Sequence, residues 1–80
     1  MKILIVEDEK ALLQSIASYL EKDGNVCETA FSYEEALYKI DLYEYDLLVL
    51  DINLITGSGL DILKLLKNDK KETATIIISA

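Results

Sequence analysis

Four short apolar runs alternate along the chain with segments whose apolar residues recur at helical spacing. The runs cover residues 2–6, 25–30, 47–51 and 75–79. Most of them are continuously apolar, as is typical of parallel strands that helices cover on both faces. The sequence therefore predicts an α/β fold of order β-α-β-α-β-α-β, in which right-handed helical crossovers join parallel strands.

The predicted helices have recognisable ends. They cover residues 9–22, 32–40 and 59–68. In the first, apolar residues recur every four positions from Leu12 to Leu20, and Gly24 follows as a C-terminal stop. Ser32 and Glu35, three residues apart, form a capping box that predicts the start of the second helix.

Length and composition limit the class of protein. The 80 residues, 51% of them hydrophobic, fit one globular domain. No apolar run is long enough to cross a bilayer or to act as a signal peptide, so we expect no membrane association and a cytoplasmic location. The net charge of −7 argues against direct binding of nucleic acid by this segment.

Metal and nucleophile chemistry is restricted to carboxylates and hydroxyls. The chain has no histidine and a single cysteine, Cys27, which excludes the usual zinc sites and Cys/His or Ser/His nucleophiles. Cys27 lies in a predicted strand, where we expect it to be a small buried hydrophobic residue. Any metal ion would be a hard cation bound by oxygen.

Three carboxylates stand at strand ends. Glu7 and Asp8 follow the first run, and Asp51 ends the third. If those strands are neighbours, the three side chains meet where parallel α/β sheets bind ligands. Two carboxylates about 4 Å apart repel by about 4 kcal/mol at an effective dielectric constant near 20, and bound Mg²⁺ would remove this cost. Alternatively, Glu7 and Asp8 only stabilise the start of the following helix through its dipole.

Four motifs in register carry a family resemblance: "ILIVEDE", "YDLLVLDINL", "GSGLDILKLLK" and "IIISA". In this order and spacing they resemble the receiver domain of bacterial two-component response regulators. The resemblance implies that residues 1–80 are a receiver domain truncated after its fourth strand. It also implies a flavodoxin-like, doubly wound parallel sheet that is incomplete, with strand order 2-1-3-4.

The resemblance assigns a role to each motif residue. It implies that Asp51 is the phosphoacceptor, which takes a phosphoryl group from a sensor histidine kinase. Glu7, Asp8 and Asp51 would bind Mg²⁺ together with the backbone carbonyl of Asn53. Ser79 matches the switch hydroxyl that contacts the phosphoryl group, although its position alone favours a strand-end hydroxyl that caps the next turn. Such a domain is not an ordinary enzyme, but it can catalyse its own phosphorylation and dephosphorylation.

The chain departs from the family pattern in two places. Ile55 stands where a proline is common, and the chain ends at Ala80, before the position of the family's lysine that contacts the phosphoryl group. The fourth strand would then be an open edge, so we expect a homodimer or higher oligomer formed by pairing at that edge.

Two other functions remain as alternatives. One is a structural or assembly fragment of a receiver fold that does not signal. The other is a phosphatase with an aspartate nucleophile, a class that needs a second aspartate two residues after the first. Lys10 occupies that position relative to Asp8, which argues against this class.

Overall fold

The computed structural model of the chain describes residues 1–51, 64 and 73–78. Its elements are β1 (Lys2–Val6), α1 (Lys10–Glu21), β2 (Val26–Ala30), α2 (Tyr33–Leu42), β3 (Leu47–Asp51) and β4 (Ala74–Ile78). Of the helix predicted at 59–68, only Lys64 is described, and it is helical. The rest of that prediction lies outside the described residues.

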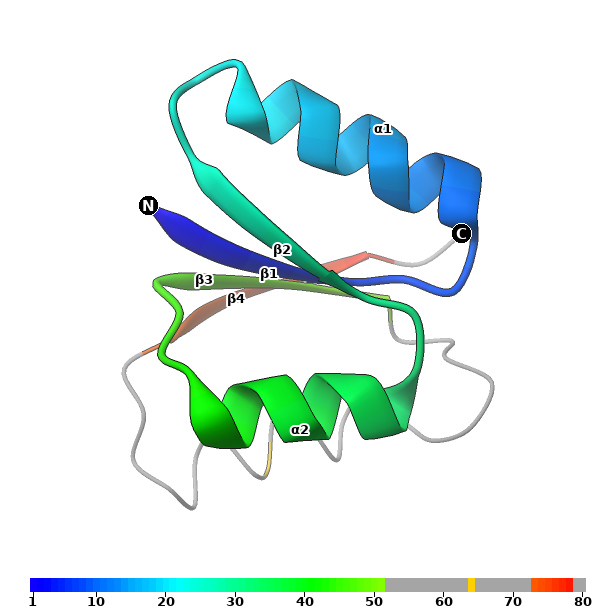
Figure 1. Ribbon diagram of the computed structural model, residues 1–80, viewed down its shortest axis with the longest axis vertical. Helices are drawn as coiled ribbons and strands as arrows, with labels where there is room; N and C mark the ends of the chain where they lie inside the picture. Colours follow the sequence, from blue (N-terminus) through cyan, green and yellow to red (C-terminus); the bar gives the residue numbers. More distant parts are fainter. Residues whose placement is uncertain (52–63, 65–72, 79–80) are drawn as a thin grey trace.

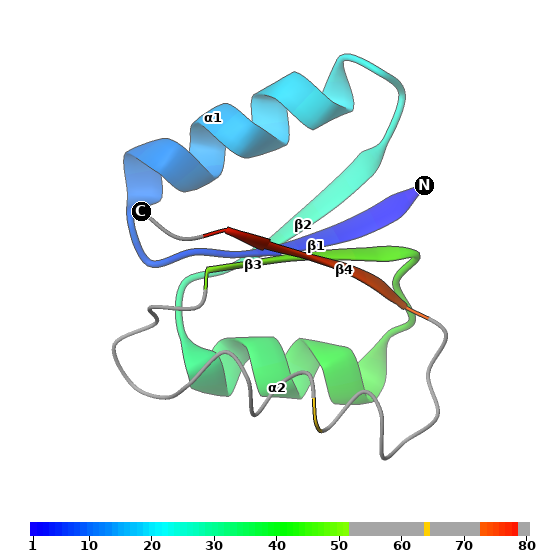
Figure 2. The ribbon, with the colours of Figure 1, turned by 180° about the vertical axis from the view of Figure 1, so that it is seen from behind.

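The four strands form one sheet in the order β2-β1-β3-β4, and each neighbouring pair is parallel. Helix α1 covers one face of the sheet and α2 covers the other (Figures 1 and 2). This arrangement confirms the predicted doubly wound parallel sheet and its strand order. It also places β1 and β3 side by side, with Val6 opposite Leu50.

Alternate residues of the central strands build two separate cores. Ile3 and Ile5 pack with Leu13 of α1, whereas Leu4 and Val6 belong to the cluster that contains Ile40 of α2. Successive side chains of a strand point to opposite faces of its sheet. A strand with an apolar layer on each side must therefore be apolar at every position, which explains the continuous run at residues 2–6.

Local signals fix the helix ends. Gly24 has a φ of +86°, a conformation that favours glycine, and its N–H donates to the Glu21 carbonyl at 3.0 Å. The Ser32 hydroxyl accepts a hydrogen bond from the Glu35 N–H at 3.1 Å, as the capping box predicts. Within the described residues, no helix is long and apolar enough to cross a membrane.

Several element bounds differ from the sequence predictions by one or two residues, and one residue differs in burial. β4 begins at Ala74, one residue earlier than predicted, and is described as far as Ile78, whereas Ser79 lies outside the described residues. Cys27 is half-buried rather than buried. It lies on β2, a strand with a neighbour on one side only among the described strands, and it packs against the cluster under α1.

Candidate functional site

The ends of β1 and β3 bring the predicted carboxylates together. Asp51 is the last residue of β3, and Glu7 directly follows β1. Because the two strands are parallel neighbours in register, their carboxyl ends reach the same edge of the sheet. The backbone N–H of Glu7 also donates to the Ala30 carbonyl of β2 at 3.0 Å, which fixes the chain just beyond the end of β1.

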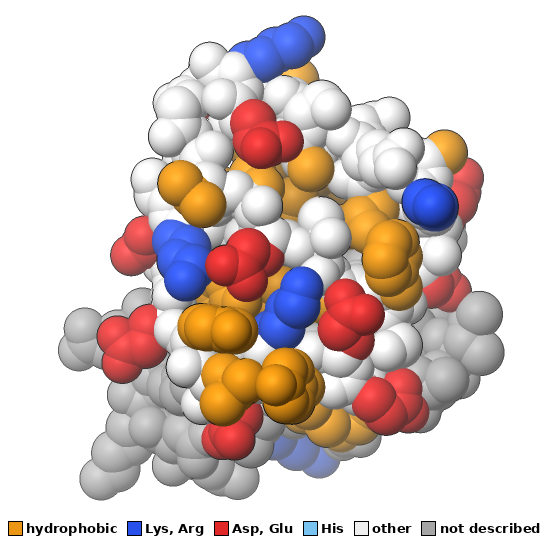
Figure 3. Space-filling view, in the orientation of Figure 1, with side chains coloured by type: hydrophobic (Ala, Val, Ile, Leu, Met, Phe, Trp, Pro, Cys, Tyr) orange, Lys and Arg blue, Asp and Glu red, His pale blue; other side chains and the backbone are white. Residues whose placement is uncertain are grey.

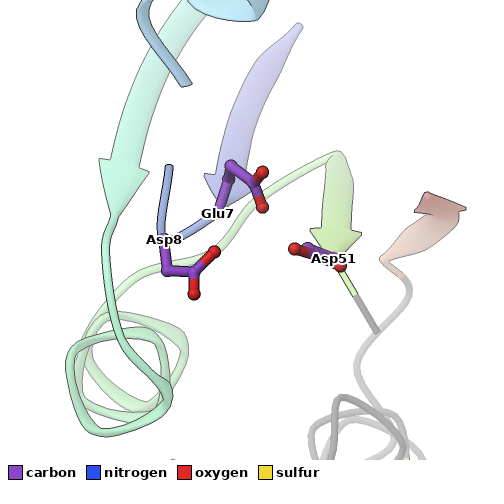
Figure 4. A group of neighbouring side chains, drawn as sticks. All are labelled: Glu7, Asp8 and Asp51. Atoms are coloured by element: carbon purple, nitrogen blue, oxygen red, sulfur yellow. The ribbon is translucent and has the colours of Figure 1, made fainter. Parts of the chain in front are cut away.

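Glu7, Asp8 and Asp51 form a compact group. One carboxylate oxygen from each lies within 4.8 Å of the other two. Figure 4 shows the Asp51 side chain directed toward the other two carboxylates. Glu7 and Asp51 are buried, with 2% and 6% of their surface exposed, whereas Asp8 is exposed. The group is therefore closed on the side of the sheet and open to solvent at Asp8.

The electrostatics of the group centre on Glu7. Its pKa is raised from 4.5 to about 7, first by burial, then by a hydrogen bond with the Asp51 side chain and by the negative charges of Asp51 and Asp8. A backbone hydrogen bond from Asp8 acts in the opposite direction. Without a cation, Glu7 thus takes up a proton at a pH where an ordinary glutamate is ionised.

The donor set suits a hard divalent cation. Glu7 Oε2 is buried and has no hydrogen-bond partner, so one acceptor oxygen of the group is left unsatisfied. Carboxylate oxygens are the ligands that Mg²⁺ and Ca²⁺ prefer. The group could hold a metal ion, which would satisfy this oxygen and reduce the repulsion between carboxylates.

The site confirms the predicted convergence of three residues. Glu7, Asp8 and Asp51 come together, and among the described residues no further metal-binding side chain joins their group. Asn53 and Ser79 lie outside the described residues, so their predicted roles remain predictions. The unequal burial of the three carboxylates was not predicted, because each of them follows an apolar strand and the sequence contains no signal that separates them.

Comparisons with known proteins agree on one family. The family model described as "response regulator receiver domain" matches residues 3–80. The chain is 38% identical over 80 residues to the two-component response regulator PhoP of Pseudomonas aeruginosa, and 37% identical over 79 residues to the cell cycle transcriptional regulator CtrA of Caulobacter vibrioides. These matches cover 100% and 99% of the chain, but only 36% and 34% of the two relatives. The chain thus spans about a third of the length of these curated relatives.

Solved structures show the same fold. The receiver domain of a Francisella response regulator superposes with a TM-score of 0.91 at 34% identity, covering 99% of this chain and 65% of that one. The response regulator TrrA from Thermotoga maritima, solved in complex with Mg²⁺-BeF, also gives a TM-score of 0.91 at 34% identity, covering 99% of this chain and 69% of that one. With a family match over nearly its whole length and this agreement in fold, the chain belongs to the response regulator receiver domain family.

Proposed function

We propose that the chain accepts a phosphoryl group on Asp51. The observation that carries this proposal is the convergence of three carboxylates within 4.8 Å at the shared edge of β1 and β3. One of their oxygens, Glu7 Oε2, is buried without a hydrogen-bond partner. A cation would satisfy this oxygen and offset the charge of the group, and a nucleophilic carboxylate beside a bound cation is suited to phosphoryl transfer.

The proposed donor is a phosphohistidine of a sensor histidine kinase, a partner that would place the chain in the cytoplasm. A carboxylate oxygen of Asp51 attacks the phosphorus, an O–P bond forms and the P–N bond breaks. The imidazole nitrogen leaves with the electron pair and takes up a proton, and Asp51 becomes an acyl phosphate. Asp51 is held by β3 in a fixed position, and positioning supplies much of the rate in such transfers.

Mg²⁺ is the proposed cation. Glu7, Asp8 and Asp51 would hold it together with the Asn53 backbone carbonyl, and the Mg²⁺-BeF complex of the relative TrrA supports this choice. When bound, Mg²⁺ offsets the charge of the phosphoryl oxygens. We assign the Ser79 hydroxyl to contact with the phosphoryl group, on the resemblance alone. With this arrangement the chain would catalyse its own phosphorylation and dephosphorylation.

Phosphoryl trapping tests the proposal. The chain is incubated with Mg²⁺ and acetyl phosphate, reduced with borohydride and analysed by peptide mass spectrometry. We expect the label on Asp51, its loss in Asp51→Asn, and normal labelling in the matched control Asp41→Asn, which changes an exposed aspartate of α2. A label that persists in Asp51→Asn contradicts the proposal, and a label on Asp8 would favour the aspartate phosphatase alternative.

A second proposal concerns assembly. We infer that the 80-residue chain pairs with a second copy along β4, which is an edge strand within the described sheet. Its Ile76 and Ile77 are 52% and 46% exposed, and an apolar edge strand invites pairing. Sedimentation at micromolar concentration should give a dimer or larger species, which Ile77→Lys should dissociate. A compact monomer of the wild-type chain, 9.0 kDa, would contradict this inference.

A further inference from the structure

The outer surface of α2 carries large apolar side chains that belong to neither core cluster of the described residues. Tyr38 is 65% exposed, Leu42 is 52% exposed, and Tyr43, directly after the helix, is 45% exposed. Residues four apart on a helix lie on the same side, so Tyr38 and Leu42 are neighbours. Figure 3 shows hydrophobic side chains gathered over α2, with acidic and some basic side chains around them. We call Tyr38, Leu42 and Tyr43 the α2 patch.

The size of the α2 patch is notable for a domain of this length. With about 200 Å² for each fully exposed side chain of this kind, the three exposures correspond to about 300 Å² of side-chain surface. Contiguous patches of this size on small proteins are often functional. Tyrosine is also enriched at protein interfaces relative to the rest of the surface.

Acidic residues surround the α2 patch. Glu34, Asp41 and Glu44 are exposed, and Glu34, Tyr38 and Asp41 share one side of the helix by their spacing. Lys39 is the one basic residue between positions 33 and 44. It is directed elsewhere, because its Nζ donates to the Thr29 carbonyl of β2 at 2.6 Å and lies 3.7 Å from a Glu35 oxygen. The border along the helix is therefore mainly negative, while Lys2, which is paired with Glu28, lies beside Tyr43.

Tyr43 of the α2 patch already has a side-chain contact in the free protein. Lys2 Nζ lies 5.1 Å from the centre of the Tyr43 ring and 3.6 Å from a Glu28 oxygen. The same glutamate accepts a hydrogen bond from the Tyr45 hydroxyl at 2.7 Å. A side chain that is ordered in the free protein loses less conformational entropy on binding. Tyr43 would therefore lose less conformational entropy when it contacts a partner.

We propose that the α2 patch is a docking surface for a basic amphipathic segment of another protein. The apolar residues of that segment would cover Tyr38 and Leu42, and its lysines and arginines would pair with Asp41 and Glu44 and stack on the Tyr38 ring. A second copy of this chain fits poorly, because a two-fold contact uses the same patch on both copies and would bring two acidic borders together. Nucleic acids and anionic membranes carry the same sign of charge as the patch border.

A designed peptide serves as the probe. It is a peptide of lysine and leucine of roughly 14 residues, about four helical turns, with leucines at helical spacing on one side. Binding to the full chain is followed by fluorescence anisotropy, beside a scrambled peptide of the same composition. We expect a Kd of the order of 10⁻⁴ M, as for small transient interfaces, and binding about tenfold weaker for the scrambled peptide.

Variants locate the contact. The double variant Tyr38→Ser, Leu42→Ser should weaken binding about tenfold, and Asp41→Lys should weaken it through charge alone while leaving the apolar residues in place. The matched control is Tyr19→Ser, because Tyr19 is 70% exposed on α1. Equal binding of the scrambled peptide, or an equal loss in Tyr19→Ser, overturns the proposal. Sedimentation in which the double variant loses self-association would assign the patch to a second copy and overturn it as well.

Discussion

Replacing Glu7 by glutamine should stabilise the metal-free chain at neutral pH. Glu7 is 2% exposed, and the oxygens of its group lie within 4.8 Å of one another. At that distance two unit charges repel by about 3.5 kcal/mol at an effective dielectric constant near 20. The rise of the Glu7 pKa from 4.5 to about 7 is equivalent to about 3 kcal/mol. Both values indicate a large destabilisation that Glu7→Gln removes.

The sign of the pH dependence follows from proton binding. Between pH 4.5 and about 7, the folded chain holds a proton on Glu7 that the unfolded chain has lost. The free energy of unfolding must therefore fall as the pH rises through this range. It should fall by about 3 kcal/mol in the wild type and by much less in Glu7→Gln. Near pH 4.5 the two proteins should have similar stability, because a protonated glutamate resembles glutamine in shape and charge.

Urea unfolding followed by circular dichroism, with EDTA present and protein concentration fixed, measures these differences. The control is Glu44→Gln, the same chemical change at an exposed residue before the amino end of β3, where we expect no comparable effect. In a parallel series with Mg²⁺, the wild type should gain more stability than Glu7→Gln. A wild-type stability that stays level from pH 5 to 7.5, or equal effects of the two variants, would refute the reasoning.

Three further variants test the packing of the fold, each measured by urea unfolding. Leu13→Ala leaves a cavity in the core under α1, where Leu13 is 1% exposed, and should lower the free energy of unfolding by about 2–5 kcal/mol. Leu12→Ala, at a half-buried position, should lower it less. Ser32→Ala removes the hydroxyl that caps α2 and should cost about 1 kcal/mol, a loss that Ser32→Asp should largely restore. Tyr45→Phe deletes the hydrogen bond to Glu28, whose pKa is lowered chiefly by that bond, and should cost about 1–2 kcal/mol. Because the Glu28 pKa is lowered, the difference between wild type and Tyr45→Phe should shrink as the pH falls through the folded-state pKa of Glu28; a difference that grows in acid would contradict this assignment.

The sequence by itself predicted the strands and helices of the described residues and the convergence of Glu7, Asp8 and Asp51. Continuous apolar runs distinguish strands with two covered faces, and Gly24 and Ser32 mark helix ends because their conformation or hydrogen bonding is local. The convergence of Glu7 and Asp51 could also be predicted. In a parallel sheet all carboxyl ends lie at one edge, so a residue's place at the end of its strand fixes its place in the fold.

The tertiary structure decided the burial, pKa and contacts of residues whose neighbours are distant in the sequence. In the sequence, all three carboxylates lie at or just after the end of an apolar run. In the structure, Glu7 and Asp51 are buried and Asp8 is exposed. The raised pKa of Glu7 follows from that burial and from charges on another strand. Likewise, Lys39 of α2 donates to the Thr29 carbonyl of β2, which directs its charge away from the α2 patch. These properties arise from pairs of residues on different elements, and only the packing of the elements against one another brings such pairs together.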